Sequence, residues 1–153
     1  MGSNIINNGL FIGDNMDLTP QDKICIPPPL FHCFGLVLGN LAVFTHGATA
    51  VYASETFNPG KVLKVVSEEK CTGLHGVPTM FVAELDHEDF HKYDYSSLRT
   101  GIAAGSSVPA KLMERIHKKL NLTGLTICYG PPPPLLPISF LPPQKISREK
   151  LTL

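Results

Sequence analysis

The feature of this sequence that most restricts its fold is the alternation of short apolar runs with longer segments of helical periodicity over residues 1–130. This alternation is typical of βαβ units, in which crossover helices join parallel strands. We therefore predict an α/β fold with a parallel sheet and crossover helices. The predicted strands span residues 23–27, 48–53, 72–75, 100–104 and 125–129. One predicted helix spans residues 34–46. Three further helices are predicted to begin at Pro59, Pro78 and Pro109.

Residues at the helix ends support these boundaries. Asn58 precedes the proline that begins the second predicted helix, and its side chain can cap the helix N-terminus. Gly47 fits the left-handed position that ends the first predicted helix. Because residues 34–46 are apolar on nearly all sides, we expect that helix to be buried.

The composition changes near Gly130. Seven of the 14 prolines lie between Pro131 and Pro143, and four of them are consecutive. Such a segment favours polyproline II and has little to bury, so we predict a domain over residues 1–130 and a proline-rich, disordered tail over 131–153. A tail of this kind can also serve as a ligand for an SH3-like groove, although proline runs are more often spacers.

The charge balance and the length of the longest apolar stretch exclude two classes of protein. Lys and Arg number 13 and Asp and Glu number 13, so the chain lacks the positive excess of an electrostatic nucleic-acid binder. The longest apolar stretch, residues 33–44, is too short to span a bilayer. The N-terminus has no signal-peptide pattern, so we expect an intracellular location and leave the organelle open.

The four cysteines, Cys25, Cys33, Cys71 and Cys128, match no zinc or redox spacing. We therefore expect buried free thiols in a reducing compartment.

One short motif matches a catalytic pattern. Residues 87–91 read His-Glu-Asp-Phe-His, the arrangement that places two zinc-binding imidazoles one helical turn apart in metalloproteases. The polar residues on either side, 86 and 92–97, instead predict a helix exit and a loop, which would not hold both imidazoles on one face. A zinc hydrolase is therefore the less favoured alternative.

In open parallel sheets, ligands bind in the loops that follow the carboxyl ends of the strands. The candidate loops here are residues 27–34, 76–78, 105–107 and the turn that begins at Gly130. Small residues at 101–107 let a flat or anionic ligand approach the backbone, although a tight turn with Ser107 as a helix cap is the simpler interpretation. His32 and His75 in such positions are more often packed core residues than catalysts.

Five segments, NNGLFIG, PLFHCFG, GVPTMF, SLRTGIAAGSSVP and TICYG, follow one another between Asn4 and Gly130. In this order and at these distances they resemble the acyl-CoA synthetases of the adenylate-forming, AMP-binding superfamily, particularly the medium-chain fatty acyl branch. Those enzymes join a fatty acid and ATP into an acyl-adenylate, and the coenzyme A thiol then displaces AMP. The resemblance implies part of the large N-terminal domain of that fold, with ATP, magnesium and coenzyme A as the parent family's cofactors and the mitochondrion among its locations.

The resemblance also implies two sets of site residues, with no catalytic residue and no metal ligand among them. The acyl and pantetheine positions are His32, Phe34, Gly76, Val77 and Pro78. The adenine and AMP positions are Gly105, Ser106, Ser107, Tyr129 and Gly130.

The departures from the family pattern concern the groups that handle phosphate. After Tyr129 and Gly130 the family's YGxTE motif continues with a Thr and a Glu, whereas residues 131–134 here are all proline. The family's phosphate loop lies upstream of this sequence, and its ribose-binding Asp and catalytic Lys lie downstream. We therefore expect a fragment that is inactive alone, binds none of those cofactors and binds a fatty acid or acyl chain weakly. The alternative is a non-catalytic acyl-binding or interaction module. We also expect that the chain can self-associate through an uncovered sheet edge.

Overall fold

A computed structural model describes residues 2–129 and 139–141 of the chain. Its core is a six-stranded sheet with the order β2-β1-β3-β4-β5-β6. The strands are β1 (Lys23–Cys25), β2 (Thr49–Val51), β3 (Gly73–Gly76), β4 (Thr100–Ala104), β5 (Gly124–Tyr129) and β6 (Ser139–Leu141). Strands β1 to β5 run parallel and β6 pairs antiparallel with β5. The predicted α/β fold with a parallel sheet is confirmed.

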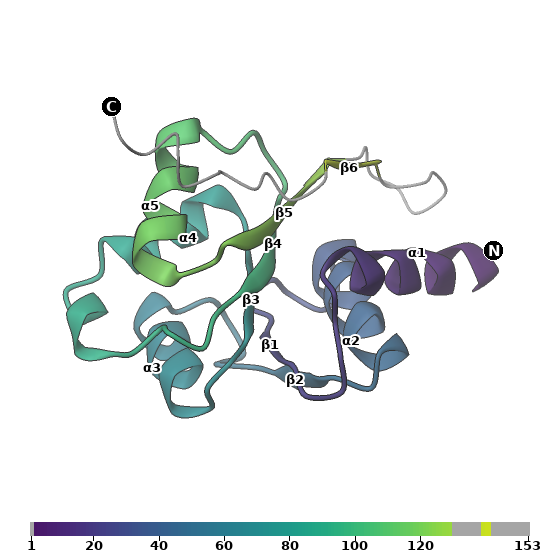
Figure 1. The fold of residues 1–153 in the computed structure, drawn as a ribbon, viewed down its shortest axis with the longest axis horizontal. Coiled ribbons are helices and arrows are strands. Elements are labelled where there is room, and N and C mark those ends of the chain that lie inside the picture. The colour runs from purple at the N-terminus through teal and green to yellow at the C-terminus, as the bar shows by residue number, and fades with distance from the viewer. Residues whose placement is uncertain (1, 130–138, 142–153) are drawn as a thin grey trace.

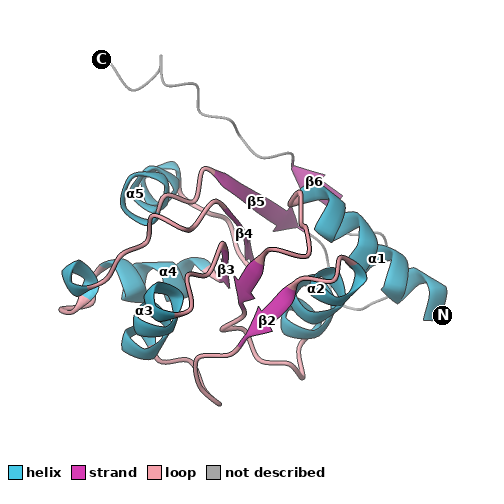
Figure 2. Cartoon of the chain, turned by 60° about the horizontal axis from the view of Figure 1, so that its bottom comes forward, coloured by secondary structure: helices cyan, strands magenta, loops and turns pink. Residues whose placement is uncertain are grey.

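Helices cover both faces of the sheet (Figure 1). They are α1 (Gly2–Asn15), the π-helix η1 (Phe34–Leu41), α2 (Ala42–Thr45), α3 (Pro59–Glu68), α4 (Pro78–Leu85), the short 3₁₀ helix η2 (Phe90–Lys92) and α5 (Ala110–Leu120). Figure 2 shows α3, α4 and α5 on one side of the strands and α1 and α2 on the other. Each layer has its own apolar core, one around Phe81 and Leu74 and the other around Ile12, Phe34 and Ile102. None of the helices in the described part of the chain is long and apolar enough to cross a membrane.

Several predicted boundaries were wrong by a few residues. The first two strands end at Cys25 and Val51, shorter than predicted, and the last predicted helix begins at Ala110 with Pro109 as its N-cap residue. The helix predicted over 34–46 is present and ends one residue earlier, at Thr45, but its first eight residues form a π-helix. The cap at Asn58 is confirmed, since its Oδ1 accepts a hydrogen bond of 2.9 Å from the Lys61 amide.

Helix α1 was not predicted, because its glycines and asparagines are weak helix formers. Those same glycines explain why it forms in the folded protein. A Cβ at Gly9 would lie 2.7 Å from the Leu41 Cβ, and one at Gly13 would lie 2.2 Å from the His46 ring. Only glycine permits such close packing of α1 against η1 and α2, so tertiary contact outweighs intrinsic propensity here.

Strand β6 lies inside the span predicted as a tail, where no strand was predicted. Its three residues pair with Ile127, Cys128 and Tyr129 at the end of β5. The predicted disorder of 131–138 and 142–153 concerns residues outside those that the structure describes.

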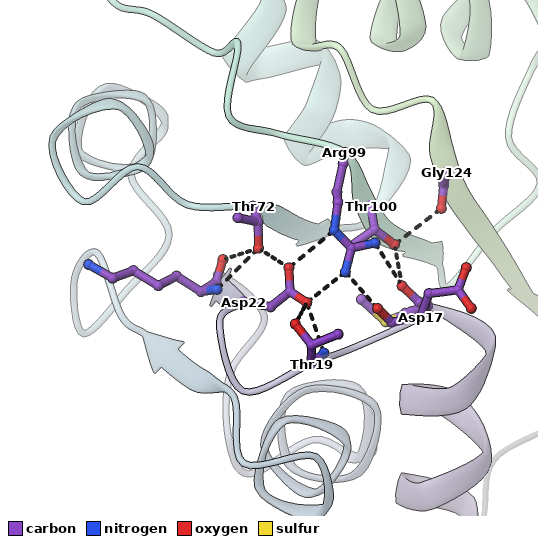
Figure 3. A network of polar contacts seen from close by, with 9 residues as sticks. Asp17, Thr19, Asp22, Thr72, Arg99, Thr100 and Gly124 are labelled. Atoms are coloured by element: carbon purple, nitrogen blue, oxygen red, sulfur yellow. Dashed lines mark hydrogen bonds and ion pairs between the residues drawn. The ribbon is translucent and has the colours of Figure 1, made fainter.

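A buried carboxylate joins three strands at their amino ends (Figure 3). Asp22, which precedes β1, is 3% exposed, and Arg99, which precedes β4, donates to both of its oxygens at 3.1 and 2.6 Å. The Thr72 hydroxyl, which precedes β3, donates to Oδ1 at 2.6 Å, and Thr19 donates to Oδ2 through its amide and its hydroxyl. Asp22 thus connects the segment before β1 to the segments before β3 and β4.

Arg99 extends this cluster to the end of α1. Its guanidinium also donates to the main-chain carbonyls of Met16 and Asp17, at 3.2 and 2.7 Å. Burial raises the pKa of Asp22, but the hydrogen bonds from Arg99, Thr72 and Thr19 outweigh burial and hold the pKa below its ordinary value. The carboxylate is therefore charged and fully paired at neutral pH.

Candidate functional site

The candidate loops leave neighbouring strands at one edge of the sheet. Gly76 at the end of β3 pairs with Ala103, and Ala104 at the end of β4 pairs with Cys128. The loops 76–78 and 105–107 therefore emerge side by side from the carboxyl ends of parallel strands, which is the edge where such sheets bind ligands.

Val77 and Gly105 bring these two loops into contact. Gly105 has a φ of +91°, and a Cβ there would lie 3.1 Å from the Val77 Cγ1. Glycine is therefore required at 105 both by the positive φ and by the approach of Val77. Ser106 and Ser107 follow it and are exposed, so the backbone of this loop is accessible from solvent.

The simpler interpretation of Ser107, as a helix cap, was wrong. The N-cap residue of α5 is Pro109, and no side chain caps that helix. Since helix α5 begins three residues after Ser107, its hydroxyl is free of that structural role. The loop 105–107 is therefore not explained by capping alone.

Gly76, Val77 and Pro78 differ in what they contribute. A Cβ at Gly76 would lie 3.2 Å from the Phe81 ring. The close packing of α4 therefore explains the glycine at this position, and no open surface is needed to explain it. Pro78 is buried and begins α4. Val77 is half-buried and packs against the apolar cluster that contains Phe34 and Ala104. Of the three, only Val77 presents a side chain on the same face as Phe34.

Phe34 is the first residue of η1 and is 4% exposed. Just before it, His32 is exposed, and its Nδ1 accepts a hydrogen bond of 3.1 Å from the Phe34 amide. His32 therefore holds the entry into η1 in place of a conventional cap. The neighbouring Phe31 is 94% exposed, which leaves a large apolar ring in solvent at the same turn.

Beneath Phe34 lies His75, which is fully buried in β3. The two rings stack with centroids 5.9 Å apart and planes at 26°. The His75 Nε2 donates a hydrogen bond of 3.2 Å to the carbonyl of Leu38, also in η1. Burial lowers the pKa of His75 to about 4, so the ring is neutral at physiological pH. His75 is thus the packed core residue that the sequence predicts, but its contact with η1 was not predicted.

Tyr129 ends β5 one residue beyond Cys128, the last residue of β5 that pairs with β4, and its backbone pairs with Ser139 of β6. Gly130, the other residue predicted beside the adenine, lies outside the described residues. Their roles stay predictions from the sequence.

The motif at residues 87–91 was predicted to lie at a helix exit and loop. In the structure it likewise does not lie on one continuous helix. Helix α4 ends at Leu85, and the His87 Nδ1 accepts a hydrogen bond of 3.1 Å from the Asp89 amide. His91 lies in η2 and contacts the Phe90 ring edge-on. Within residues 2–129 and 139–141, no three His, Cys, Asp or Glu side chains gather in a group that could hold a metal.

We expect purified protein to contain no stoichiometric zinc. His91→Ala should change the free energy of unfolding by about 0.5 kcal/mol or less, because exposed surface positions rarely contribute more. Elemental analysis after dialysis measures the first quantity and urea denaturation the second. Zinc retained at one equivalent, and lost in His91→Ala, would contradict the prediction.

The expectation of buried thiols was right for Cys25, Cys71 and Cys128 and wrong for Cys33, which is exposed. Cys33 lies at the turn before η1, where the chain enters the sheet layer from solvent. Its neighbours in the sequence are apolar, but the burial of side chains at this turn begins only with the next residue, Phe34.

Comparison with known proteins finds one family and many relatives. The sequence model of the family described as AMP-binding enzyme matches residues 3–132. The acyl-CoA ligase SID4 of Ajellomyces capsulatus is 58% identical over 127 residues, which are 83% of this chain and 22% of the relative. The mitochondrial medium-chain acyl-CoA ligase ACSF2 of Homo sapiens is 40% identical over 131 residues, 83% of this chain and 21% of the relative.

Solved structures share the fold at lower sequence identity. The anthranilate CoA ligase AuaEII in complex with anthranoyl-AMP has a TM-score of 0.75 and 24% identity, over 84% of this chain and 25% of that one. ATP-bound MatB from Rhodopseudomonas palustris has a TM-score of 0.73 and 21% identity, over 92% of this chain and 27% of that one. The chain thus spans about a fifth of the length of the curated relatives it matches.

Proposed function

Because this chain belongs to the family of AMP-binding enzymes, we propose that residues 4–130 are the acyl- and adenine-binding portion of a fatty acyl-CoA synthetase. The parent reaction joins an acid to the coenzyme A thiol through an acyl-adenylate. The observation that carries this proposal is the contact between Val77 and Gly105, which joins the loops of β3 and β4 at one edge of the sheet beside Phe34.

On the acyl side, the proposal rests on apolar side chains from three separate segments. Phe34 and Ala104 are buried in one cluster, and Val77 packs against it while staying partly exposed. A fatty acyl chain that contacts Val77 would bury further apolar area, at about 0.8 kcal/mol for each methylene. His32 lies at the turn before η1 and Phe34 is the first residue of η1, where the family separates the acyl and pantetheine channels.

On the adenine side, the proposal rests on the exposed backbone of one loop and on one aromatic residue at the end of the neighbouring strand. The exposed backbone at Gly105, Ser106 and Ser107 carries no bulky group, so a flat purine can approach it closely. Tyr129, at the end of the neighbouring strand, supplies the type of ring that stacks on a purine. These residues fit an adenine ring.

The same loops do not fit magnesium triphosphate. Positions 105–107 offer two hydroxyls and backbone amides but no carboxylate and no ammonium group, and positions 131–134 are proline where the family has Thr and Glu. Adenylation requires charge stabilisation at the phosphate, often the largest share of catalysis. We therefore propose that this chain binds an acyl group weakly and does not form an acyl-adenylate by itself.

A second candidate function, an interaction module, is favoured by apolar side chains that face solvent. Ile6, Leu10 and Phe11 on α1 are 56%, 40% and 54% exposed. Strand β2 also forms one edge of the sheet, with unpaired backbone groups that another strand can meet. Self-association through this edge would appear as a rise in sedimentation coefficient with concentration, and its absence at high concentration would argue against the module.

The test of the proposed function combines binding with turnover. We expect no pyrophosphate release above the blank with decanoic acid, ATP and magnesium, and weak decanoic acid binding that ATP does not strengthen. Val77→Glu should abolish that binding by placing a charge against the acyl chain, because burying an unpaired charge is costly.

The matched control is Val82→Glu, since Val82 is an exposed valine on the outer face of α4. It should bind decanoic acid as the unmodified chain does. Pyrophosphate release that depends on the acid and disappears in His32→Ala or Tyr129→Ala would show that the chain is itself a catalyst.

A further inference from the structure

His75 is a buried histidine whose ring makes two contacts with one short segment. Its Nε2 donates to the Leu38 carbonyl at 3.2 Å, and its ring stacks on Phe34. Leu38 and Phe34 lie four residues apart in η1, whereas His75 lies in β3. The ring therefore ties the π-helix to a central strand of the sheet at two points.

The protonation of the ring follows from these contacts. A carbonyl oxygen can only accept, so the proton must be on Nε2 and the lone pair on Nδ1. Nδ1 is buried and has no hydrogen-bond partner among the residues that the structure describes. The lowered pKa of His75 agrees with a ring that stays neutral and keeps this tautomer. Leaving a buried nitrogen unpaired costs free energy, so the hydrogen bond and the stacking contact of the ring must offset that cost.

The segment that His75 holds is unusual in its geometry. Residues 34–41 form a π-helix, a conformation that is rare and that commonly marks functional sites. A polar contact from outside the helix, such as the one to the Leu38 carbonyl, can help to hold it away from the regular α-helix. Since Phe34 begins this segment, its ring position depends on the π-helical turn that follows it.

We propose that His75 is a positioning residue that holds η1 and the Phe34 ring in place and thereby sets which acyl chain lengths bind beside Phe34 and Val77. This inference rests on the proposed acyl-binding function. It assigns to a core histidine a specificity role that acts through Phe34, without contact between His75 and the ligand.

Two substitutions separate the contacts of His75. His75→Phe keeps an aromatic ring against Phe34 but removes the donor to Leu38, whereas His75→Gln keeps an N–H donor and removes the ring. His117→Phe is the matched control, because His117 lies in α5 on the opposite face of the sheet and also has a buried, unpartnered ring nitrogen. All variants are made in the full chain.

The first readout is the ratio of dissociation constants for octanoic and dodecanoic acids. His75→Phe should change this ratio by about fivefold or more, the scale of burying one methylene in an apolar site. In His75→Gln and in His117→Phe the ratio should equal that of the unmodified chain. An unchanged ratio in His75→Phe would overturn the inference, even if both His75 variants melt at lower temperature.

The second readout is amide hydrogen exchange over residues 34–41, which needs no ligand. Exchange in His75→Phe should be about tenfold faster, as expected for the loss of one hydrogen bond, and near normal in His75→Gln. If His75→Phe does not fold, His75→Met replaces it, since it also lacks a donor. Exchange that is equally slow in the donor-lacking variant would overturn the positioning role.

The two readouts distinguish this inference from the proposed function. If the unmodified chain binds neither acid, the proposed function and the chain-length role both fail, and exchange still decides whether His75 positions η1. If the chain binds the acids but the variants do not alter their ratio, the proposed function stands and the role of His75 in specificity fails.

Discussion

Asp22→Ala is expected to lower the free energy of unfolding by about 3 kcal/mol, because it leaves Arg99 and Thr72 without their shared acceptor. The loss should exceed that of a surface pair, since the Asp22 side chain is only 4% exposed. Glu69→Ala is the matched control, because the pair of Glu69 with Lys23 is exposed and should contribute about 0.5 kcal/mol or less. Urea denaturation at neutral pH measures both.

The same carboxylate predicts a loss of stability in acid. The pKa of Asp22 is lowered in the folded protein, so its contribution is complete above the unfolded pKa of about 4 and is lost as the pH falls through the folded pKa. The difference between unmodified protein and Asp22→Asn should therefore be largest at neutral pH and shrink below about pH 4. A difference that stays constant down to pH 2 would contradict this assignment.

Glu84→Met is expected to raise the free energy of unfolding by about 2 kcal/mol at mildly alkaline pH, because it removes a polar group that is buried without partners. Glu84 lies on α4 and is fully buried, and no group in residues 2–129 or 139–141 forms a hydrogen bond with either of its carboxylate oxygens. Burial raises the pKa of Glu84 well above its ordinary value, so the side chain is protonated in the folded state where it would be ionised in the unfolded chain.

The direction of the pH effect follows from that proton. Between the unfolded pKa and the raised folded pKa, the folded protein holds a proton that the unfolded chain has released, so stability falls as the pH rises. Glu84→Met should flatten this fall, whereas Glu88→Met, at an exposed position nearby, should leave it unchanged. Stability that is independent of pH from 5 to 9 in the unmodified protein would contradict the prediction.

The local sequence was sufficient to predict the layered fold. Glycine and proline interrupt the chain between many of the apolar runs, and most of these runs have the period of one element, so the order of most strands and helices could be predicted. The loops at 76–78 and 105–107 could also be located, because parallel strands separated by crossover helices end at one edge of the sheet. The ligand chemistry assigned to those loops came from the family resemblance and not from their composition.

Features that depend on residues far apart in the sequence were decided only by the tertiary structure. The Asp22 cluster joins positions 50 and 77 residues apart, and His75 reaches a carbonyl 37 residues away. Helix α1, with poor intrinsic propensity, forms because Gly9 and Gly13 let it pack closely on η1 and α2. Periodicity records which face of one segment is apolar, but a hydrogen bond between segments depends on their packing in space. For that reason the sequence alone determined the order and type of most elements, whereas the structure determined α1, the π-helical form of η1, and the histidine that holds it.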